Sequence, residues 1–266
     1  MRTRKAFTLI ELLVVITIIA LLIGILLPAL GAARRVAGEI KDGTQVRGIH
    51  HAMVLYAQSN GSNYPGLTAN GKNKKKADID VACSKNGVNV EARMMIMLIG
   101  NYVTGDYIIC PAEIKQIWTT GNVDSSNYSY SLLQISDNDQ PVINSGVPKG
   151  NSGRQAEWKE GLNMEATVIT NRAKGTSSSI YSYHSKKPDA GKHAWRGNVG
   201  YNDNHVVMEE SHELNTQYGG GPNITDDHIF DEVGGTSDSG TIENNNAVMI
   251  FQGYKDDSSS GYSGDG

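Results

Sequence analysis

Several side chains of metal-binding type lie close together between residues 193 and 212. They are His193, Asp203, His205, Glu209 and His212. Imidazole and carboxylate groups are common zinc ligands, and alternation along a strand would put Asp203 and His205 on one face. However, no two of these residues form a helical pair of the HExxH kind, and a polar β-hairpin explains the same composition. We therefore expect a hairpin rather than a zinc site.

Carboxylates gather again a little further along the chain. Asp226, Asp227, Asp231 and Glu232 offer the hard oxygen ligands that Ca²⁺ prefers. Their spacing fits no EF-hand loop, so calcium is a candidate ion supported only by ligand type. We expect no other cofactor.

The chain has only two cysteines, Cys83 and Cys110. This number excludes a disulfide-dense miniprotein, a four-cysteine zinc site and an iron–sulfur cluster. Outside the cytoplasm the two could form a disulfide, and closing a loop of about 27 residues would contribute roughly 3.5 kcal/mol in the chain-entropy model. Two buried free thiols are the alternative.

Motifs for nucleophilic catalysis and phosphate binding are missing from the sequence. It contains no Gly-x-Ser-x-Gly, no phosphate-binding loop and no dinucleotide fingerprint after a strand. The formal net charge of −4 argues against nucleic acid as the main partner. We therefore predict a protein that is not an enzyme and does not act primarily on nucleic acid.

The most informative segment is the apolar run Phe7–Leu30, FTLIELLVVITIIALLIGILLPAL. At about 1.5 Å per residue it reaches roughly 36 Å, enough to cross a hydrocarbon core of about 30 Å. Arg2, Arg4 and Lys5 precede it and would stay in the cytoplasm, so the rest of the chain would lie outside. Glu11 is the anomaly, because a carboxylate in such a segment costs about 2.5–3.5 kcal/mol at the helix centre.

The N-terminal residues KAFTLIE, 5–11, resemble the leader of type IV prepilins and type II secretion pseudopilins. The resemblance implies cleavage by a prepilin peptidase between Ala6 and Phe7, followed by methylation of the new amine. Ala6 stands where the family usually has Gly. It further implies that Glu11 pairs with the N-terminal amine of a neighbouring subunit, which would offset the burial of both charges. Pro28 falls where type IV pilins commonly have a proline.

The same resemblance implies the partners and the location. They are the prepilin peptidase, other pilin or pseudopilin subunits and the assembly platform of the bacterial inner membrane. The protein would cross that membrane once, with its head in the periplasm, and would be extracted into a filament. A type II secretion system and a type IV pilus both remain open.

The segment from His193 onward carries a second resemblance. His193, Asp203 and Asn204 match an H-x9-D-G element found near the C-terminus of many planctomycete-type pseudopilin-like proteins, with Asn204 in place of the usual Gly. Asn also tolerates left-handed backbone geometry. Major pseudopilins often hold calcium in a C-terminal loop, which is the reason to prefer calcium over zinc here.

Apolar spacing past Pro28 predicts that one helix continues to about Gln58, where the turn sequence NGSNYP begins. Glycines at 31, 38, 43 and 48 each weaken a helix by roughly 1 kcal/mol, so local unwinding near 38–44 is an alternative. His50 and His51 point about 100° apart and are not expected to share a metal. Further on we expect a helix at 91–99 and strands at 107–111, 127–135, 165–170, 179–183, 198–201, 205–209 and 246–252.

These elements predict an α+β protein with a pilin-like fold. A long N-terminal helix, transmembrane in its first half, packs on an antiparallel β-sheet head. We expect a leader at 1–6, a transmembrane and assembly helix at 7–30, its amphipathic continuation at 31–60, the head at 61–255 and a flexible acidic tail at 256–266.

Two competing interpretations use the N-terminus differently. It could be an ordinary secretory signal cut near residues 29–33, although the apolar run is longer than usual and contains Glu11. The chain could also be a membrane-anchored or secreted enzyme, or a carbohydrate-binding module, that uses the N-terminus only as a signal or anchor.

Overall fold

The structure is a computed structural model that describes residues 8–72, 90–135, 152–161, 163–176, 179–189, 192–216, 218, 224–230, 249–251 and 262–263. The chain divides into two compact units, residues 1–40 and 41–266. Helix α1 (Leu9–Gln58) contributes to both units.

The first unit is the N-terminal part of α1. Its large apolar side chains, from Leu9 to Leu30, are all exposed, and Pro28 lies inside the helix. Among the described residues, α1 is the one helix that is long and apolar enough to cross a membrane, and none of its most apolar window is buried. The predicted apolar helix is therefore confirmed, and among the described residues its apolar side chains from Leu9 to Leu30 are exposed.

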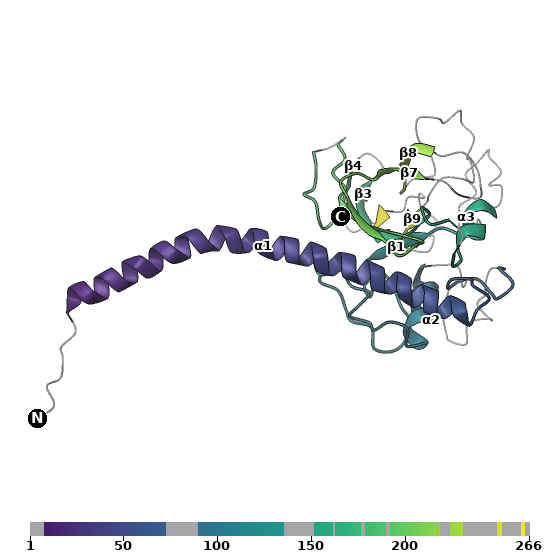
Figure 1. Ribbon diagram of the computed structural model, residues 1–266, viewed down its shortest axis with the longest axis horizontal. Coiled ribbons are helices and arrows are strands. Elements are labelled where there is room, and N and C mark those ends of the chain that lie inside the picture. The colour runs from purple at the N-terminus through teal and green to yellow at the C-terminus, as the bar shows by residue number, and fades with distance from the viewer. Residues whose placement is uncertain are drawn as a thin grey trace, which may run out of the picture. The chain divides into compact units, whose positions relative to one another are not determined.

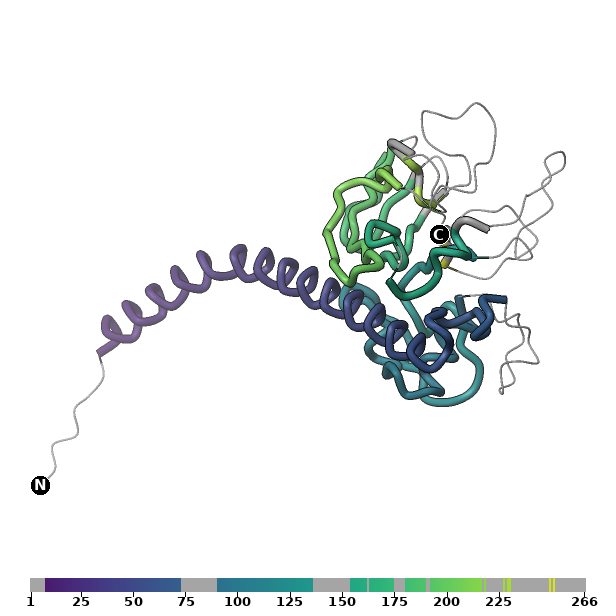
Figure 2. The backbone as a smooth tube through the Cα atoms, turned by 45° about the vertical axis from the view of Figure 1, so that its right-hand side comes forward, coloured from purple at the N-terminus to yellow at the C-terminus, as the bar shows by residue number. Residues whose placement is uncertain are grey.

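The C-terminal part of α1 belongs to the head and is largely buried there. Its buried apolar side chains follow helical spacing, as in Val46, Ile49, Met53 and Tyr56. In Figures 1 and 2 this part of α1 lies between the α2 segment on one side and the strands on the other. The helix ends at Gln58 as predicted, because Asn60–Asn63 turn the chain back.

The unwinding considered near residues 38–44 does not occur, since α1 is continuous. Two of its glycines instead allow close packing. A Cβ atom on Gly43 would lie 3.0 Å from Oδ1 of Asn198, and one on Gly48 would lie 2.3 Å from the hydroxyl of Tyr107. Glycine is therefore used here to bring other segments close to the helix.

The head contains two further helices and ten strands among the described residues (Figure 1). The helices are α2 (Val90–Ile99) and α3 (Ser152–Glu157). The strands are β1 (Tyr130–Leu133), β2 (Thr167–Asn171), β3 (Ala173–Thr176), β4 (Ser179–Tyr181), β5 (Gly197–Tyr201), β6 (Val206–Glu209), β7 (Glu213–Thr216), β8 (Ile224–His228), β9 (Met249–Ile250) and β10 (Tyr262–Ser263).

The largest sheet has five antiparallel strands in the order β6-β5-β2-β1-β9. β1 and β2 are buried along their whole length, and Val46 of α1 approaches the sheet at Gly200. A three-stranded sheet has the order β10-β3-β4, and β7 pairs with β8. The α+β class and the pilin-like arrangement of a long helix with an antiparallel sheet are confirmed.

Most expected strands exist in shortened form, but the strand predicted at 107–111 is wrong. That segment forms turns, although Ile108 and Cys110 are buried as a strand would require. The reason is a side chain of α1: Nε2 of Gln45 donates to the carbonyl oxygens of Asp106, Tyr107 and Ile109, so these groups do not face a neighbouring strand. The sequence analysis also missed α3, β3, β7, β8 and β10, the last of which lies in the predicted tail.

Candidate functional site

The start of α1 is a capping box formed by Thr8 and Glu11. The backbone N–H of Glu11 donates to Oγ1 of Thr8 (3.3 Å), and the backbone N–H of Thr8 donates to Oε2 of Glu11 (2.8 Å). The Thr8 hydroxyl also donates to Oε2 (2.6 Å). This reciprocal pattern satisfies two N–H groups at the helix start. The sequence analysis missed it, although T-x-x-E at the head of an apolar run is its signature.

The predicted cleavage point cannot be placed, because Ala6 and Phe7 lie outside the described residues. Cleavage there would leave Thr8 as the second residue of the mature chain, so the capping box would survive. The backbone N–H and the hydroxyl of Thr8 both donate to Oε2 of Glu11. The Glu11 carboxylate can therefore still accept a hydrogen bond from a neighbouring amine.

The segment 198–208 forms the predicted hairpin, with β5 and β6 joined by a tight turn. Asn204 has a φ of 69°, a left-handed geometry that Asn tolerates better than most residues. The turn is closed by hydrogen bonds from Asn204 N–H to the Tyr201 carbonyl (2.9 Å) and from Tyr201 N–H to the His205 carbonyl (3.0 Å).

The turn of this hairpin is attached to α1 by a buried polar network. Nδ1 of His50 lies 3.1 Å from Oδ1 of Asn204, and its Nε2 lies 3.2 Å from the Tyr64 hydroxyl. That hydroxyl donates to Oδ1 of Asn202 (2.6 Å). Burial lowers the pKa of His50, although the hydrogen bonds of Asn204 and Asn202 oppose the change. His51 is exposed, so the two histidines do not share a site.

The five side chains considered for zinc do not come together. His193 packs its ring against His212 with centroids 4.9 Å apart, and Nδ1 of His193 accepts the backbone N–H of Ile180. Asp203 instead accepts hydrogen bonds from the backbone N–H and the ring of His205. The Asp203–His205 contact lies in the turn between β5 and β6 and supports the hairpin interpretation.

The candidate calcium ligands lie mostly beyond the described part of the chain. Asp231 and Glu232 are outside the described residues, and so is the side chain of Asp226. Asp227 is on β8, fully buried, and its Oδ2 accepts a hydrogen bond from Thr216. The calcium site stays a prediction.

A group that the sequence analysis missed brings together Asp42, Cys110 and His184. Among the described residues these are the three metal-binding side chains whose ligand atoms all lie within 4.8 Å of one another. Nε2 of His184 lies 3.2 Å from Oδ2 of Asp42 and 3.6 Å from Sγ of Cys110. Asp42 is on α1, Cys110 lies in the turn segment after α2, and His184 follows β4.

Two further side chains hold the Asp42 carboxylate. The Tyr130 hydroxyl of β1 donates to Oδ1 (2.8 Å), and Nδ2 of Asn198 on β5 donates to Oδ2 (2.5 Å). Burial opposes ionisation of Asp42, but its contacts with His184 and Asn198 prevail and lower its pKa. Burial raises the pKa of the Cys110 thiol, and the nearby Asp42 raises it further.

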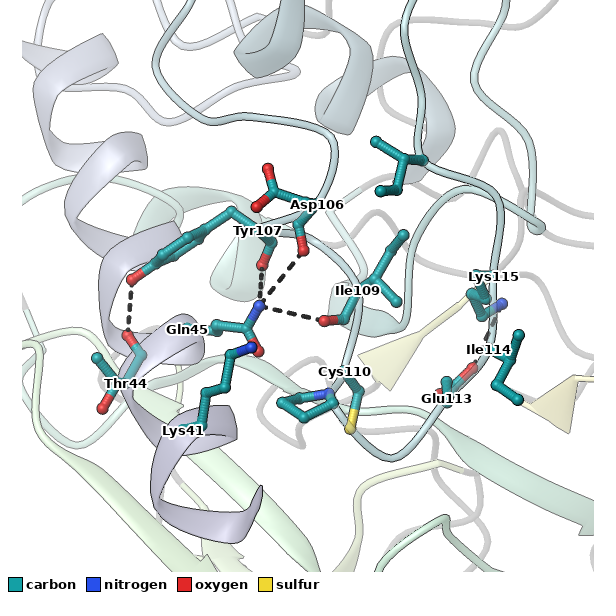
Figure 3. A pocket seen from close by; sticks show the side chains of 12 residues that line it. Lys41, Thr44, Gln45, Asp106, Tyr107, Ile109, Cys110, Glu113, Ile114 and Lys115 are labelled. Atoms are coloured by element: carbon teal, nitrogen blue, oxygen red, sulfur yellow. Dashed lines mark hydrogen bonds and ion pairs between the residues drawn. The ribbon is translucent and has the colours of Figure 1, made fainter. Parts of the chain in front are cut away.

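Cys110 is buried and has no disulfide partner among the described residues, and its sulfur lies 3.6 Å from Nε2 of His184. Cys83 lies outside the described residues, so the predicted disulfide stays a prediction. Cys110 also lines a cavity of about 570 Å³ between α1 and the turn segment, together with Lys41, Gln45 and Tyr107 (Figure 3). Figure 3 shows the Gln45 amide turned toward the three carbonyl groups that it binds.

Comparison with known proteins identifies one family motif. The family described as the prokaryotic N-terminal methylation motif matches residues 1–27. Searches of the curated proteins and of the solved structures return no match. The match supports an N-terminus of the type IV pilin-like class and covers about a tenth of the chain.

Proposed function

We propose that the chain is a structural subunit of a pilus-like filament, either a pseudopilin of a type II secretion system or a type IV pilin-like protein. The observation that carries the proposal is the combination of the methylation motif over residues 1–27 with an apolar helix whose side chains from Leu9 to Leu30 are all exposed. Such a surface needs a bilayer before assembly and other apolar helices after it.

In the proposed pathway the prepilin peptidase cuts between Ala6 and Phe7 in the inner membrane. The helix then keeps the subunit in that membrane, with the head in the periplasm, until the assembly platform transfers it into the filament. Glu11 pairs there with the N-terminal amine of a neighbouring subunit. An unpaired carboxylate costs about 2.5–3.5 kcal/mol at the centre of a membrane helix and less near its end, and Glu11 lies in the first turn of α1, so the pair favours one register.

The first test is the mature N-terminus, measured by intact-mass and N-terminal peptide spectrometry on protein from a host with a prepilin peptidase. A chain that starts at methylated Phe7 supports the proposal. An Ala6→Leu variant serves as a control, because a bulky residue before the cut should leave the leader attached. A mature chain that starts near residues 29–33 contradicts the proposal, since the helix would then be discarded as a signal.

The second candidate function is a membrane-anchored or secreted enzyme or carbohydrate-binding module. It is distinguished by a Glu11→Ala variant, followed both for membrane insertion and for incorporation into filaments. Loss of filaments with normal insertion supports the filament subunit. Unchanged incorporation would contradict the role that we assign to Glu11.

A further inference from the structure

We propose that Asp42, Cys110 and His184 bind a transition-metal ion of the zinc type. The proposal concerns the head alone and does not depend on whether the N-terminal helix enters a filament. It rests on the positions of the three ligand atoms, on their burial and on the residues that support them.

The ligand spacing fits a tetrahedral zinc ion. With zinc about 2.0 Å from nitrogen or oxygen and about 2.3 Å from sulfur, tetrahedral angles separate a nitrogen from an oxygen by about 3.3 Å and from a sulfur by about 3.5 Å. The observed distances are 3.2 Å from Nε2 of His184 to Oδ2 of Asp42 and 3.6 Å from Nε2 to Sγ of Cys110.

The same geometry argues against a catalytic Cys-His-Asp triad. A triad uses the two ring nitrogens separately, one for the carboxylate and the other for the nucleophile. Here Nε2 of His184 faces both Asp42 and Cys110. The Cys110 thiol also hydrogen-bonds Asp42, so all three side chains converge on one point, where a single ion could contact all of them.

Burial and charge favour a cation at this point. The side chains of Asp42 and His184 are 0% and 4% exposed, and Cys110 is 1% exposed as a residue. A buried carboxylate is stabilised by a partner of opposite charge or by a metal, and His184 is the ion-pair partner of Asp42 in this structure. A dication would be neutralised by one carboxylate and one thiolate, and the mixture of imidazole, thiolate and carboxylate suits zinc rather than calcium or magnesium.

The surrounding residues resemble the support that metal ligands usually have. Tyr130 and Asn198 each donate to one oxygen of Asp42, which fixes the orientation of the carboxylate. Three protein ligands leave one coordination position for a solvent molecule. Of the three ligands, Cys110 also lines the cavity of about 570 Å³ (Figure 3).

The experiment uses the full-length chain in detergent, without a histidine tag and under reducing conditions. The protein is treated with a chelator, and Co²⁺ and then Zn²⁺ are titrated as probes. We expect one metal ion per chain, together with the visible bands of tetrahedral Co²⁺ and a thiolate-to-metal charge-transfer band. Wild-type protein that gives no such band, or that retains clearly less than one Zn²⁺ per chain, overturns the proposal.

Variants identify the ligands. Cys110→Ser should abolish the charge-transfer band, and Asp42→Asn and His184→Gln should each weaken binding by more than about 100-fold. Asn198→Ala, which removes only a supporting hydrogen bond, should weaken it about 10–100-fold. Cys83→Ser is the matched control and should leave the band unchanged; loss of the band in this variant instead would contradict the assignment of Cys110.

Thermal unfolding separates metal binding from a structural defect. A ligand that binds only the folded state stabilises it according to its concentration relative to Kd. Wild-type protein should therefore unfold at a higher temperature with Zn²⁺ than with chelator, and Cys110→Ser should show no difference between the two. If both proteins respond equally to Zn²⁺, the ion binds elsewhere and the proposal is wrong.

Discussion

Nδ1 of His50 on α1 lies 3.1 Å from Oδ1 of Asn204 in the β5–β6 turn, although the two residues are 154 positions apart in sequence. The contact joins the β5–β6 hairpin to α1 inside the head. It depends on the His50 ring and on the left-handed backbone of Asn204. Asn204 therefore has two separable functions, one in its left-handed backbone and one in its side-chain amide.

Two substitutions of Asn204 separate these functions. Asn204→Gly keeps the left-handed backbone but removes the partner of the buried His50, so it should lower the free energy of unfolding by about 1–3 kcal/mol. Asn204→Ala should lower it by about 1–2 kcal/mol more, because Ala is strained at a φ of 69°. Denaturant unfolding measures both changes. Equal stability of the Gly and Ala variants would show that the turn relaxes.

The burial of His50 predicts a pH dependence of stability. Burial lowers the pKa of His50 in the folded state, against opposing contributions from Asn204, Asn202 and the charge of Asp203. The unfolded chain then binds more protons below its ordinary pKa of about 6.5, so stability should fall as the pH drops below that value. It should level off once the pH is below the folded-state pKa.

The contribution of His50 is isolated by comparison with His50→Gln, which cannot titrate. The melting temperatures of the two proteins are measured between neutral and mildly acidic pH. Wild-type protein should lose more stability over this interval than the variant does. Parallel curves would mean that His50 is not held neutral in the folded state.

The sequence indicates the fold through its long periodic segments. The apolar run from Leu9 onward and the spacing of Val46, Ile49 and Met53 predict α1 and its end at Gln58. The short strands are harder to predict from the sequence, because tertiary contacts determine whether such a segment forms a strand. The apolar run 107–111 is an example, since the amide of Gln45 binds its carbonyl groups and prevents a ladder.

The candidate sites also differ in how far the sequence predicts them. The N-terminal motif is local in sequence and could be identified from residues 5–11 alone. Asp42, Cys110 and His184 come from three distant segments, so no spacing connects them. The sequence contains a weak indication of this cluster. Asp42 and Gln45 are polar, but they lie on the same helix face as the apolar Val46 and Ile49. Polar residues on such a face need buried partners.

The position of Gln45 requires a hydrogen-bond donor, so a carboxylate there should destabilise the head. Gln45→Glu replaces the donor to three carbonyl oxygens with a carboxylate of the same shape, and it should destabilise the head by several kcal/mol. Gln45→Met removes the donor without adding charge and should cost about 1–3 kcal/mol. Urea unfolding of the two variants tests whether Gln45→Glu is less stable than Gln45→Met. A Glu variant as stable as the Met variant would contradict the donor role.

Gly48 should resist substitution despite its place in a helix. Ala is favoured over Gly by roughly 1 kcal/mol in a helix, but a Cβ atom here would lie 2.3 Å from the Tyr107 hydroxyl. Gly48→Ala should therefore destabilise the head by about 1–3 kcal/mol through overpacking. Gly38→Ala is the matched control, because nothing lies within 4 Å of its Cβ position. Thermal unfolding should show a neutral or stabilising effect at 38 and a loss at 48.

The capping box raises a question about Glu11, since its carboxylate serves the helix start as well as the proposed pair with a neighbouring amine. Glu11→Gln keeps an oxygen that accepts the N–H of Thr8 but removes the negative charge. Thr8→Ala removes the hydroxyl from the box and keeps the charge, at a cost of about 0.5–2 kcal/mol to the helix start. The two variants therefore separate capping from charge pairing.

If Glu11 pairs with an amine in the filament, Glu11→Gln should reduce filament yield about tenfold, because the amine is left unpaired among apolar helices, where an unpaired charge is costly even near a helix end. Thr8→Ala should assemble nearly as well as wild-type protein. Filaments are quantified from sheared cell-surface fractions, and membrane levels of each variant are measured in parallel to exclude loss of the subunit. The reverse order, with Thr8→Ala defective and Glu11→Gln normal, would assign Glu11 to capping alone.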